Sequence, residues 1–224
     1  MTTITDNALI TDSQIQKSTN GCTIKTNGHA PATKIQKPTE AEAEAAVRTL
    51  IAWAGDDPER EGLIDTPKRV AKAYKEFFKG YEEDAIDILS RTFEDVGGYD
   101  DMIMLRGIDM SSHCEHHMVP FIGKVHIAYM PSEKVVGISK LARIVETFSK
   151  RLQTQETMTA QIAAAIDEGL QARGTAVMIE AEHQCMSMRG VQKQNVATIT
   201  TRFTGVFDSN KDLKERFLGL IKNG

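Results

Sequence analysis

The chain has 224 residues, and its 27 basic and 31 acidic side chains give a formal net charge of −4. This balance excludes a general nucleic-acid binder, because no overall positive field would attract phosphates, so any anionic ligand requires a local basic cluster. No run of apolar residues is long enough for a membrane span, and the first residues lack the charged and apolar segments of a secretory signal. An odd count of three cysteines fits a reducing compartment better than a disulfide framework, so we expect a cytoplasmic protein with no membrane partner.

Residues 1–37 are rich in Thr, Asn, Gln, Ser and Lys and show no sustained hydrophobic period. A segment of this composition buries too little apolar surface to fold, so it predicts a disordered tail, in which Cys22 has no expected role. Residues 38–100 carry helical periods and form a predicted N-terminal helical region. Residues 101–224 form the predicted catalytic domain.

Two helix starts are visible in the N-terminal helical region. Thr39 and Glu42 are spaced as a capping box, in which each side chain accepts from the other residue's backbone N–H, and the helix that follows should end near Gly55. At the second start, Thr66 is the expected N-cap and Pro67 the first helical residue. An apolar stripe at helical spacing follows each start, and that of the second helix should belong to the core.

The pattern changes to alternating apolar and polar residues from Met102 onward. The elements expected from there, in chain order, are strands over 102–108 and 123–130, helices over 139–148 and 155–172, strands over 175–183 and 195–206, and a short terminal helix over 210–221. Gly174 is the expected cap at the end of the second helix, and His126 is expected to be a surface or sheet histidine rather than a ligand. This order predicts an α+β fold with an antiparallel sheet, whose edges would be protected if several copies joined in a ring.

Two of the three cysteines and five of the six histidines lie in or near two short segments, 111–117 and 183–185. Residues three apart in a turn lie on the same side, so Cys114 and His117 can converge on one point while His116 faces elsewhere. This concentration of ligand-type side chains predicts a site that uses both segments.

In an extended segment residues two apart share a face, so His183 and Cys185 can point into one pocket. With Cys114 and His117, Cys185 would make a set of two sulfurs and one imidazole that suits zinc and leaves a fourth position for water. His116 and His183 would then be unbound imidazoles placed for proton transfer. The spacing alone leaves other interpretations open: a structural zinc site, cysteines that only fill the core, or a Cys–His nucleophilic pair.

Five short motifs, in order and at matching separations, closely resemble those of the GTP cyclohydrolase I family. They are Thr66-Pro-Lys-Arg-Val-Ala71, Cys114-Glu-His-His117, Gly137-Ile-Ser-Lys140-Leu-Ala-Arg143, Gln155-Glu156, and His183-Gln-Cys185 with Arg189-Gly190. The resemblance covers the chain from near Thr39 to its C-terminus. It implies the tunnelling fold, in which ββααββ units join edge to edge into oligomeric barrels, two pentamers stack as a homodecamer, and active sites lie where subunits meet.

The resemblance further implies a zinc-dependent hydrolase that converts GTP to 7,8-dihydroneopterin triphosphate and formate, at the start of tetrahydrofolate or tetrahydrobiopterin biosynthesis. Cys114, His117 and Cys185 would bind the zinc ion, whose activated water attacks C8 of guanine. His183 would protonate the neighbouring ring nitrogen, and His116 would be the second proton donor. The residues implied in GTP recognition are Glu156 and Gln155 at guanine, Ser139 near the ribose, and Lys140, Arg143, Arg189 and Arg69 at the triphosphate.

Two alternatives to this function stay open. Another tunnelling-fold enzyme of pterin or deazapurine metabolism, such as a nitrile reductase with a cysteine nucleophile, should lack the combination of zinc ligands and triphosphate-binding cations. A non-catalytic zinc protein would close the metal with a fourth side chain and would leave the absorbance of GTP unchanged.

Overall fold

The computed structural model describes residues 36–93 and 99–222. The predicted disordered tail falls almost wholly outside these residues, as does Cys22, so what is expected of both stays a prediction. Among the helices that are described, none is long and apolar enough to cross a membrane.

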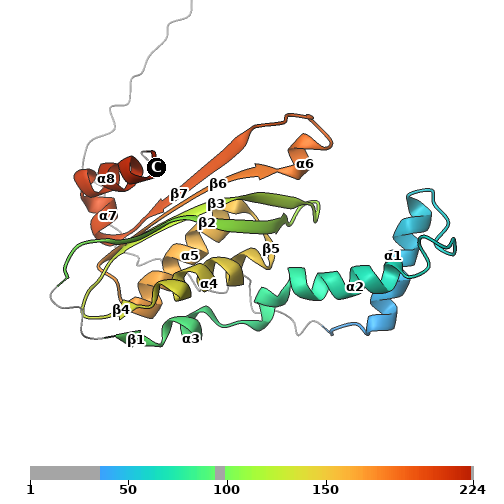
Figure 1. Cartoon of the computed structure of the whole chain (residues 1–224), viewed down its shortest axis with the longest axis horizontal. Helices are drawn as coiled ribbons and strands as arrows, with labels where there is room; N and C mark the ends of the chain where they lie inside the picture. The colour runs from blue at the N-terminus through green and yellow to red at the C-terminus, as the bar shows by residue number, and fades with distance from the viewer. Residues whose placement is uncertain (1–35, 94–98, 223–224) are drawn as a thin grey trace, which may run out of the picture.

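A five-stranded sheet forms the body of the molecule, with its strands in the order β5-β2-β3-β6-β7 (Figure 1). The four long strands are antiparallel neighbours, and they are β2 (Ile103–Cys114), β3 (Pro120–Met130), β6 (Gly174–His183) and β7 (Ala197–Phe203). The short β5 (Leu152–Gln153) pairs in parallel with the end of β2. Two helices, α4 (Ile138–Ser149) and α5 (Gln155–Leu170), cover one face of the sheet. The predicted α+β order of two strands, two helices and two strands is therefore confirmed.

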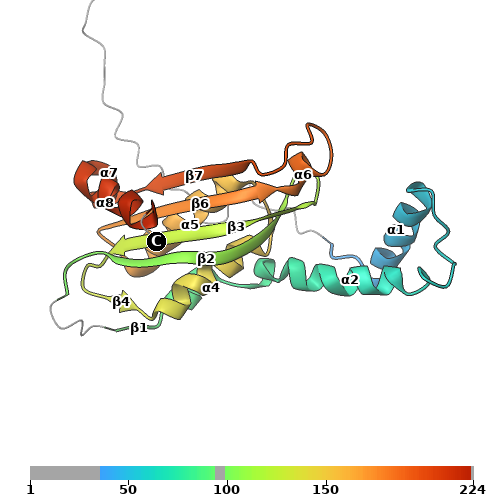
Figure 2. The ribbon, with the colours of Figure 1, turned by 45° about the horizontal axis from the view of Figure 1, so that its top comes forward.

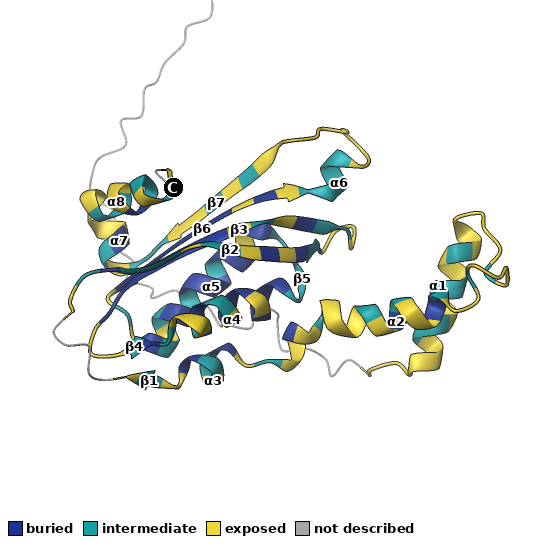
Figure 3. Cartoon of the chain, viewed as in Figure 1, coloured by how far each residue is buried: buried dark blue, intermediate teal, exposed yellow. Residues whose placement is uncertain are grey.

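The two faces of the sheet are covered differently. On the face under α4 and α5, alternate β3 residues such as Val125 and Ile127 are fully buried. On the opposite face, Met130 packs with two C-terminal helices, α7 (Gly205–Ser209) and α8 (Lys211–Lys222). These helices cover only one end of that face, and Figure 3 shows that much of β7 stays exposed.

The predicted capping box opens α1 (Glu40–Trp53) and is confirmed. The Thr39 hydroxyl accepts from the Glu42 backbone N–H at 3.3 Å, and the Glu42 carboxylate accepts from the Thr39 N–H at 2.7 Å. Two backbone donors that the first helical turn leaves unpaired are thereby satisfied. The helix ends at Trp53, with Ala54 as its C-cap, close to Gly55 as expected.

The second helix start was predicted one residue too late. In α2 (Thr66–Phe77) the N-cap is Asp65, and no side chain caps the helix. The Thr66 hydroxyl instead accepts from the Arg69 guanidinium at 3.0 Å. Together α1 and α2 form an arm that projects from the end of the sheet (Figures 1 and 2).

Short elements connect this arm to the helices under the sheet. They are the 3-10 helix η1 (Lys79–Glu82), α3 (Ala85–Leu89), and a small separate sheet of β1 (Thr92–Phe93) and β4 (Val135–Val136). The Arg151 guanidinium donates to the Gly80 carbonyl oxygen at 2.9 Å and lies 4.9 Å from the ring centre of Phe148. This cation therefore ties η1 to the end of α4.

Gly174 does not cap α5, contrary to the prediction from its position. The helix ends at Leu170, and Gln171 takes the left-handed conformation with φ of 48°. Gly174 is instead the first residue of β6, where a Cβ atom would lie 2.5 Å from the carbonyl oxygen of Thr204. The glycine is required by the close approach of the chain before α7, a contact between distant segments.

Candidate metal and active site

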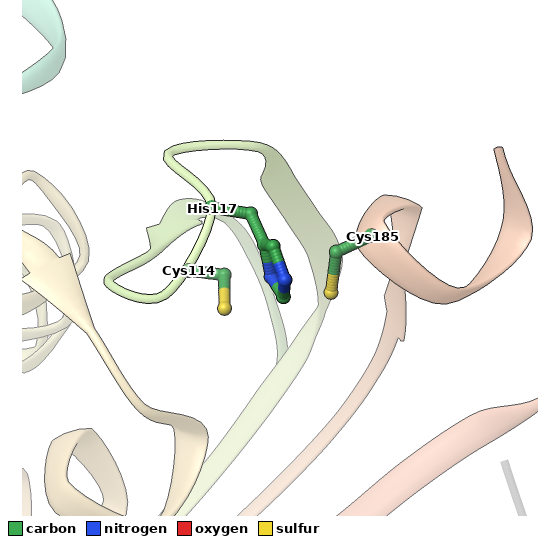
Figure 4. A group of neighbouring side chains, drawn as sticks. All are labelled: Cys114, His117 and Cys185. Atoms are coloured by element: carbon green, nitrogen blue, oxygen red, sulfur yellow. The ribbon is translucent and has the colours of Figure 1, made fainter. Parts of the chain in front are cut away.

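Three potential metal ligands from two distant segments converge at one end of the sheet. Cys114 is the last residue of β2, His117 lies in the turn that follows, and Cys185 lies in the short helix α6 (Gln184–Ser187). Their ligand atoms all lie within 4.8 Å of one another, and Figure 4 shows the three side chains directed into one space. The His117 backbone N–H donates to the Cys114 carbonyl oxygen at 3.3 Å, so the predicted turn does bring these two residues together.

The donor set and its surroundings fit a metal ion. Two sulfurs and an imidazole nitrogen are typical zinc ligands, and in the part of the chain that the structure describes no fourth His, Cys, Asp or Glu joins the group. Burial raises the pKa of the Cys185 thiol, and the neighbouring Cys114 raises it further. Two thiolates this close repel each other, and a bound dication would remove that cost. The cluster can therefore hold a metal ion and leave one position open.

The structure corrects the route by which Cys185 reaches the cluster. The prediction placed His183 and Cys185 on one face of an extended segment, but β6 ends at His183 and Cys185 belongs to α6. A turn of helix, rather than strand alternation, carries the thiol toward Cys114. The predicted convergence is correct, although the backbone geometry used to argue for it is wrong.

His116 does not face away from the metal ligands, contrary to the prediction. Its ring is exposed, and its Nδ1 atom lies 3.6 Å from Cys114 Sγ. Its Nε2 atom lies 4.0 Å from a carboxylate oxygen of Glu115, a residue for which the sequence suggests no role. The imidazole is thus close to a ligand sulfur and still open to solvent.

His183 lies at the end of β6 with its ring held on two sides. The ring stacks on Phe121, with ring centres 4.6 Å apart and planes inclined by 2°. Its Nε2 atom lies 2.8 Å from Oε1 of Gln155. Burial lowers the pKa of His183, and the Glu156 carboxylate acts in the opposite direction. The sequence motifs do not point to Phe121, because it meets His183 only through the register of β3 with β6.

Gln155 and Glu156 are neighbours at the start of α5 but differ in burial. Gln155 is only 1% exposed, and its side-chain amide forms hydrogen bonds inside the protein, whereas Glu156 is exposed. Arg189 is exposed as well, and its charge partly offsets the effect of burial on the pKa of the Cys185 thiol. Glu156 and Arg189 are thus accessible charged groups, the first acting on the pKa of His183 and the second on that of Cys185.

Ser139 and Lys140 lie at the opposite end of the sheet. They occupy the first turn of α4, directly after β4, where the Val136 N–H donates to the buried Tyr129 hydroxyl at 3.2 Å. Along β3, Tyr129 is eight residues from Phe121, which stacks on the site histidine, and such a length of strand spans about 26 Å. Figure 2 likewise shows β4 and α6 at opposite ends of the sheet.

The remaining expected phosphate-binding residues are also apart from the cluster. Arg143 is exposed one turn further along α4. Arg69 lies in the first turn of α2, on the arm, where its guanidinium is 3.7 Å from the Asp65 carboxylate. The expected site residues therefore fall into two groups. Those near the three metal ligands are His116, His183, Gln155, Glu156 and Arg189, and those elsewhere are Ser139, Lys140, Arg143 and Arg69.

The sequence matches known proteins over most of its length. A family model described as GTP cyclohydrolase I matches residues 43–222. GTP cyclohydrolase 1 of Hyphomonas neptunium is 70% identical over 186 residues, which are 83% of this chain and 90% of that protein. The protein of the same name from Maricaulis maris is 64% identical over 83% of this chain and 91% of its own length. That of Brucella abortus is 56% identical over 94% of this chain and 99% of its own length.

Among solved structures, an archaeosine synthase QueF-like protein in its apo form is similar with a TM-score of 0.40 and 13% identity, over 48% of this chain and 96% of that chain. A TM-score this low does not establish a shared fold. The family model, in contrast, matches most of this chain, and the sequence relatives match over most of both chains. The chain belongs to the GTP cyclohydrolase I family.

Proposed function

We propose that this chain hydrolyses GTP to formate and 7,8-dihydroneopterin triphosphate, the first step of tetrahydrofolate biosynthesis, with a zinc ion held by Cys114, His117 and Cys185. The main support is a cluster of three ligand atoms within 4.8 Å of one another, with the His116 imidazole outside the cluster and 3.6 Å from Cys114 Sγ. A closed structural site would need a fourth ligand, and none joins the cluster among residues 36–93 and 99–222. Zinc, when bound, supplies Lewis-acid activation of water.

His183 is the proposed donor of a proton to the guanine ring nitrogen next to the attacked carbon. Its ring is fixed against Phe121 at the end of β6. Because burial lowers the pKa of His183, its protonated form is a stronger acid than an imidazolium in water. A stronger acid suits proton transfer to a weakly basic ring nitrogen.

His116 is the proposed second proton donor, which assists opening of the ribose. Its ring lies next to Cys114, with Nδ1 at 3.6 Å from Sγ, and is exposed. An imidazole in this position can exchange protons with solvent while it stays beside the proposed metal ligand Cys114.

Glu156 is the proposed recognition group for guanine. Guanine presents two donors along one edge, its ring N–H and its amino group, and one carboxylate accepts both. Glu156 is exposed in the first turn of α5, and the residue before it contacts His183. A base held by this carboxylate would therefore lie near the proposed acid, with Arg189 available to the phosphates.

We further propose that two copies of the chain share each active site, within rings of five that stack as a decamer. One chain cannot bring its own far end to its own metal cluster, but a neighbouring copy can present that end. The edge strand β7 supports association, since its Ile199 side chain is 57% exposed. The residues proposed to come from a neighbour are Ser139, Lys140 and Arg143 on α4 and Arg69 on the arm.

Incubation of zinc-loaded protein with GTP tests the proposed reaction, with formate release and dihydropterin absorbance followed together. Both products should appear, and both should vanish when a chelator removes the metal. Formate without dihydropterin would contradict the roles proposed on the ribose side. If neither product formed, a non-catalytic zinc protein would be favoured.

A further inference from the structure

The buried side chain of Gln155 has partners at both of its polar atoms. Its amide nitrogen lies 3.1 Å from the Ile179 carbonyl oxygen on β6, 2.9 Å from the Thr198 carbonyl oxygen on β7, and 3.1 Å from the Thr200 hydroxyl. Its amide oxygen lies 2.8 Å from Nε2 of His183. With 1% of the residue exposed, this side chain joins two strands and a site histidine inside the protein.

These partners determine which way round the amide lies. The carbonyl oxygens of Ile179 and Thr198 only accept hydrogen bonds, so the group that faces them must be the NH2 of Gln155. A flipped amide would place its oxygen against two other oxygens and lose both bonds. The amide oxygen of Gln155, which only accepts, must therefore face His183.

The orientation of the amide determines where His183 carries its hydrogen. Nε2 must be the donor, so in the neutral ring Nδ1 keeps the lone pair. Nδ1 of His113 and of His126 are buried without a partner, whereas Nδ1 of His183 is not among such enclosed atoms of the described residues. With the ring plane fixed on Phe121, Nδ1 is thus the nitrogen open to a ligand.

We propose that Gln155 is a positioning residue for His183, which it holds as the Nε2–H tautomer so that Nδ1 exchanges the proton with substrate. This assigns to Gln155 a role other than the guanine contact expected from the family resemblance, and its catalytic consequence rests on the function proposed above. When the imidazolium acts as acid, the N–H bond at Nδ1 breaks and an N–H bond forms on the guanine nitrogen. The neutral ring keeps its Nε2 hydrogen and its bond to Gln155, so no supporting hydrogen bond has to rearrange.

Gln153, two residues earlier, provides a matched control. It is also buried, at 3% exposed, and its amide nitrogen donates to the Phe148 carbonyl oxygen at 3.0 Å and to the Gln161 amide oxygen at 2.9 Å. Among the described residues, no histidine forms a hydrogen bond with its side chain. Gln153→Met and Gln155→Met therefore remove the same polar atoms from a buried site, but only the second removes the acceptor of His183.

Nitrogen-15 NMR of the ring nitrogens, on zinc-free and zinc-loaded protein, tests the tautomer without turnover, and His183→Ala identifies the signals. The unaltered protein should show a hydrogen-bearing Nε2 that exchanges slowly with water and an Nδ1 with a lone pair. In Gln155→Met this exchange should accelerate at least about tenfold and both tautomers should be populated, whereas Gln153→Met should keep the original signature. A lone pair on Nε2 of His183 in the unaltered protein would overturn the proposal. This outcome does not depend on whether any variant folds.

Steady-state kinetics separates positioning from guanine binding. Loss of positioning in Gln155→Met should lower kcat about 10- to 100-fold and leave KM for GTP within about twofold, with zinc content unchanged. A raised KM with kcat preserved would show a substrate contact instead and overturn the proposal. If the unaltered protein did not turn over GTP, the proposed function would fail, while the NMR signature would still decide the tautomer.

Discussion

The two ends of the sheet differ in how completely one chain builds them. At one end the three candidate metal ligands converge, and Nε2 of His183 lies 2.8 Å from the amide oxygen of Gln155. The other end carries Ser139 and Lys140 at the start of α4, directly after β4, which Tyr129 ties to the sheet, with no metal-type cluster among its described residues. Groups that do chemistry need geometry fixed to a fraction of an ångström, which one hydrogen-bonded sheet supplies. Long cationic side chains that hold phosphates tolerate placement across an interface.

The largest expected effect comes from breaking the metal end. Cys185→Ala removes a ligand, so zinc should be lost and turnover should fall at least about a thousandfold, because activation of water depends on the metal. The matched control is His183→Ala, two residues away, which should keep stoichiometric zinc and lose about 100- to 10,000-fold in turnover as the acid is removed. Metal analysis and formate release measure both variants. Full zinc in Cys185→Ala would remove this cysteine from the ligand set.

A mixing experiment sharpens the comparison by asking whether the two ends act in different copies. Lys140→Ala and Cys185→Ala should each have little activity alone. Refolded together in equal amounts, they should recover about a quarter of the unaltered activity, since random mixing pairs an intact metal end with an intact far end in that share of sites. A mixture of His183→Ala and Cys185→Ala, which damages the same end twice, should recover none. Equal recovery in the two mixtures would contradict a shared site.

Tyr129→Phe should weaken the far end and spare the metal end. It leaves the Val136 N–H without its acceptor in a buried place, so the free energy of unfolding should fall by about 1–3 kcal/mol. KM for GTP should rise as the start of α4 loosens, while zinc affinity stays unchanged. The control is Tyr99→Phe, because the exposed Tyr99 also makes one hydrogen bond, to the Met102 carbonyl oxygen at 2.9 Å. Urea unfolding and kinetics measure these effects, and a loss of zinc affinity would show that the two ends are not independent.

The smallest effect concerns the middle of the sheet. His126 is 7% exposed and lies outside the metal cluster, so it is a buried sheet histidine. Burial lowers the pKa of His126, and the Glu180 carboxylate offsets this only in part. The unfolded chain then binds the proton more readily, so the free energy of unfolding should decrease as the pH falls below about 6.5. His126→Leu should flatten this decrease in urea unfolding, by less than the loss in Tyr129→Phe. An unchanged pH dependence in His126→Leu would show that His126 does not cause the loss of stability at low pH.

Patterns that act over a few residues predicted the secondary structure well, and their failures share one cause. Strand alternation and helical periods predicted the ββααββ order, and the capping box of Thr39 and Glu42 is present, because such features depend on near neighbours. The start at Thr66 and the role of Gly174 were wrong. At each position a contact with another residue decides the role. The Thr66 hydroxyl accepts a hydrogen bond from the Arg69 guanidinium, and Gly174 lies against the Thr204 carbonyl oxygen.

The candidate site, like the secondary structure, was predictable only where short segments of the sequence determine it. Residue types and spacing pointed to the three ligands, which the structure brings together. Nothing in the motifs marked Phe121, and the family resemblance assigned Gln155 to guanine rather than to His183. Both contacts depend on the register of β3, β6 and β7, which is set across segments up to tens of residues apart.

By itself, the sequence determined which residues could bind a metal ion, because ligand type and turn spacing are properties of short segments such as the one from Cys114 to His117. Only the tertiary structure decided what surrounds them. It placed Gln155 against His183 and Lys140 at the far end of the sheet. Strand register and the placement of α4 arise from packing between distant segments, and no local pattern encodes that packing.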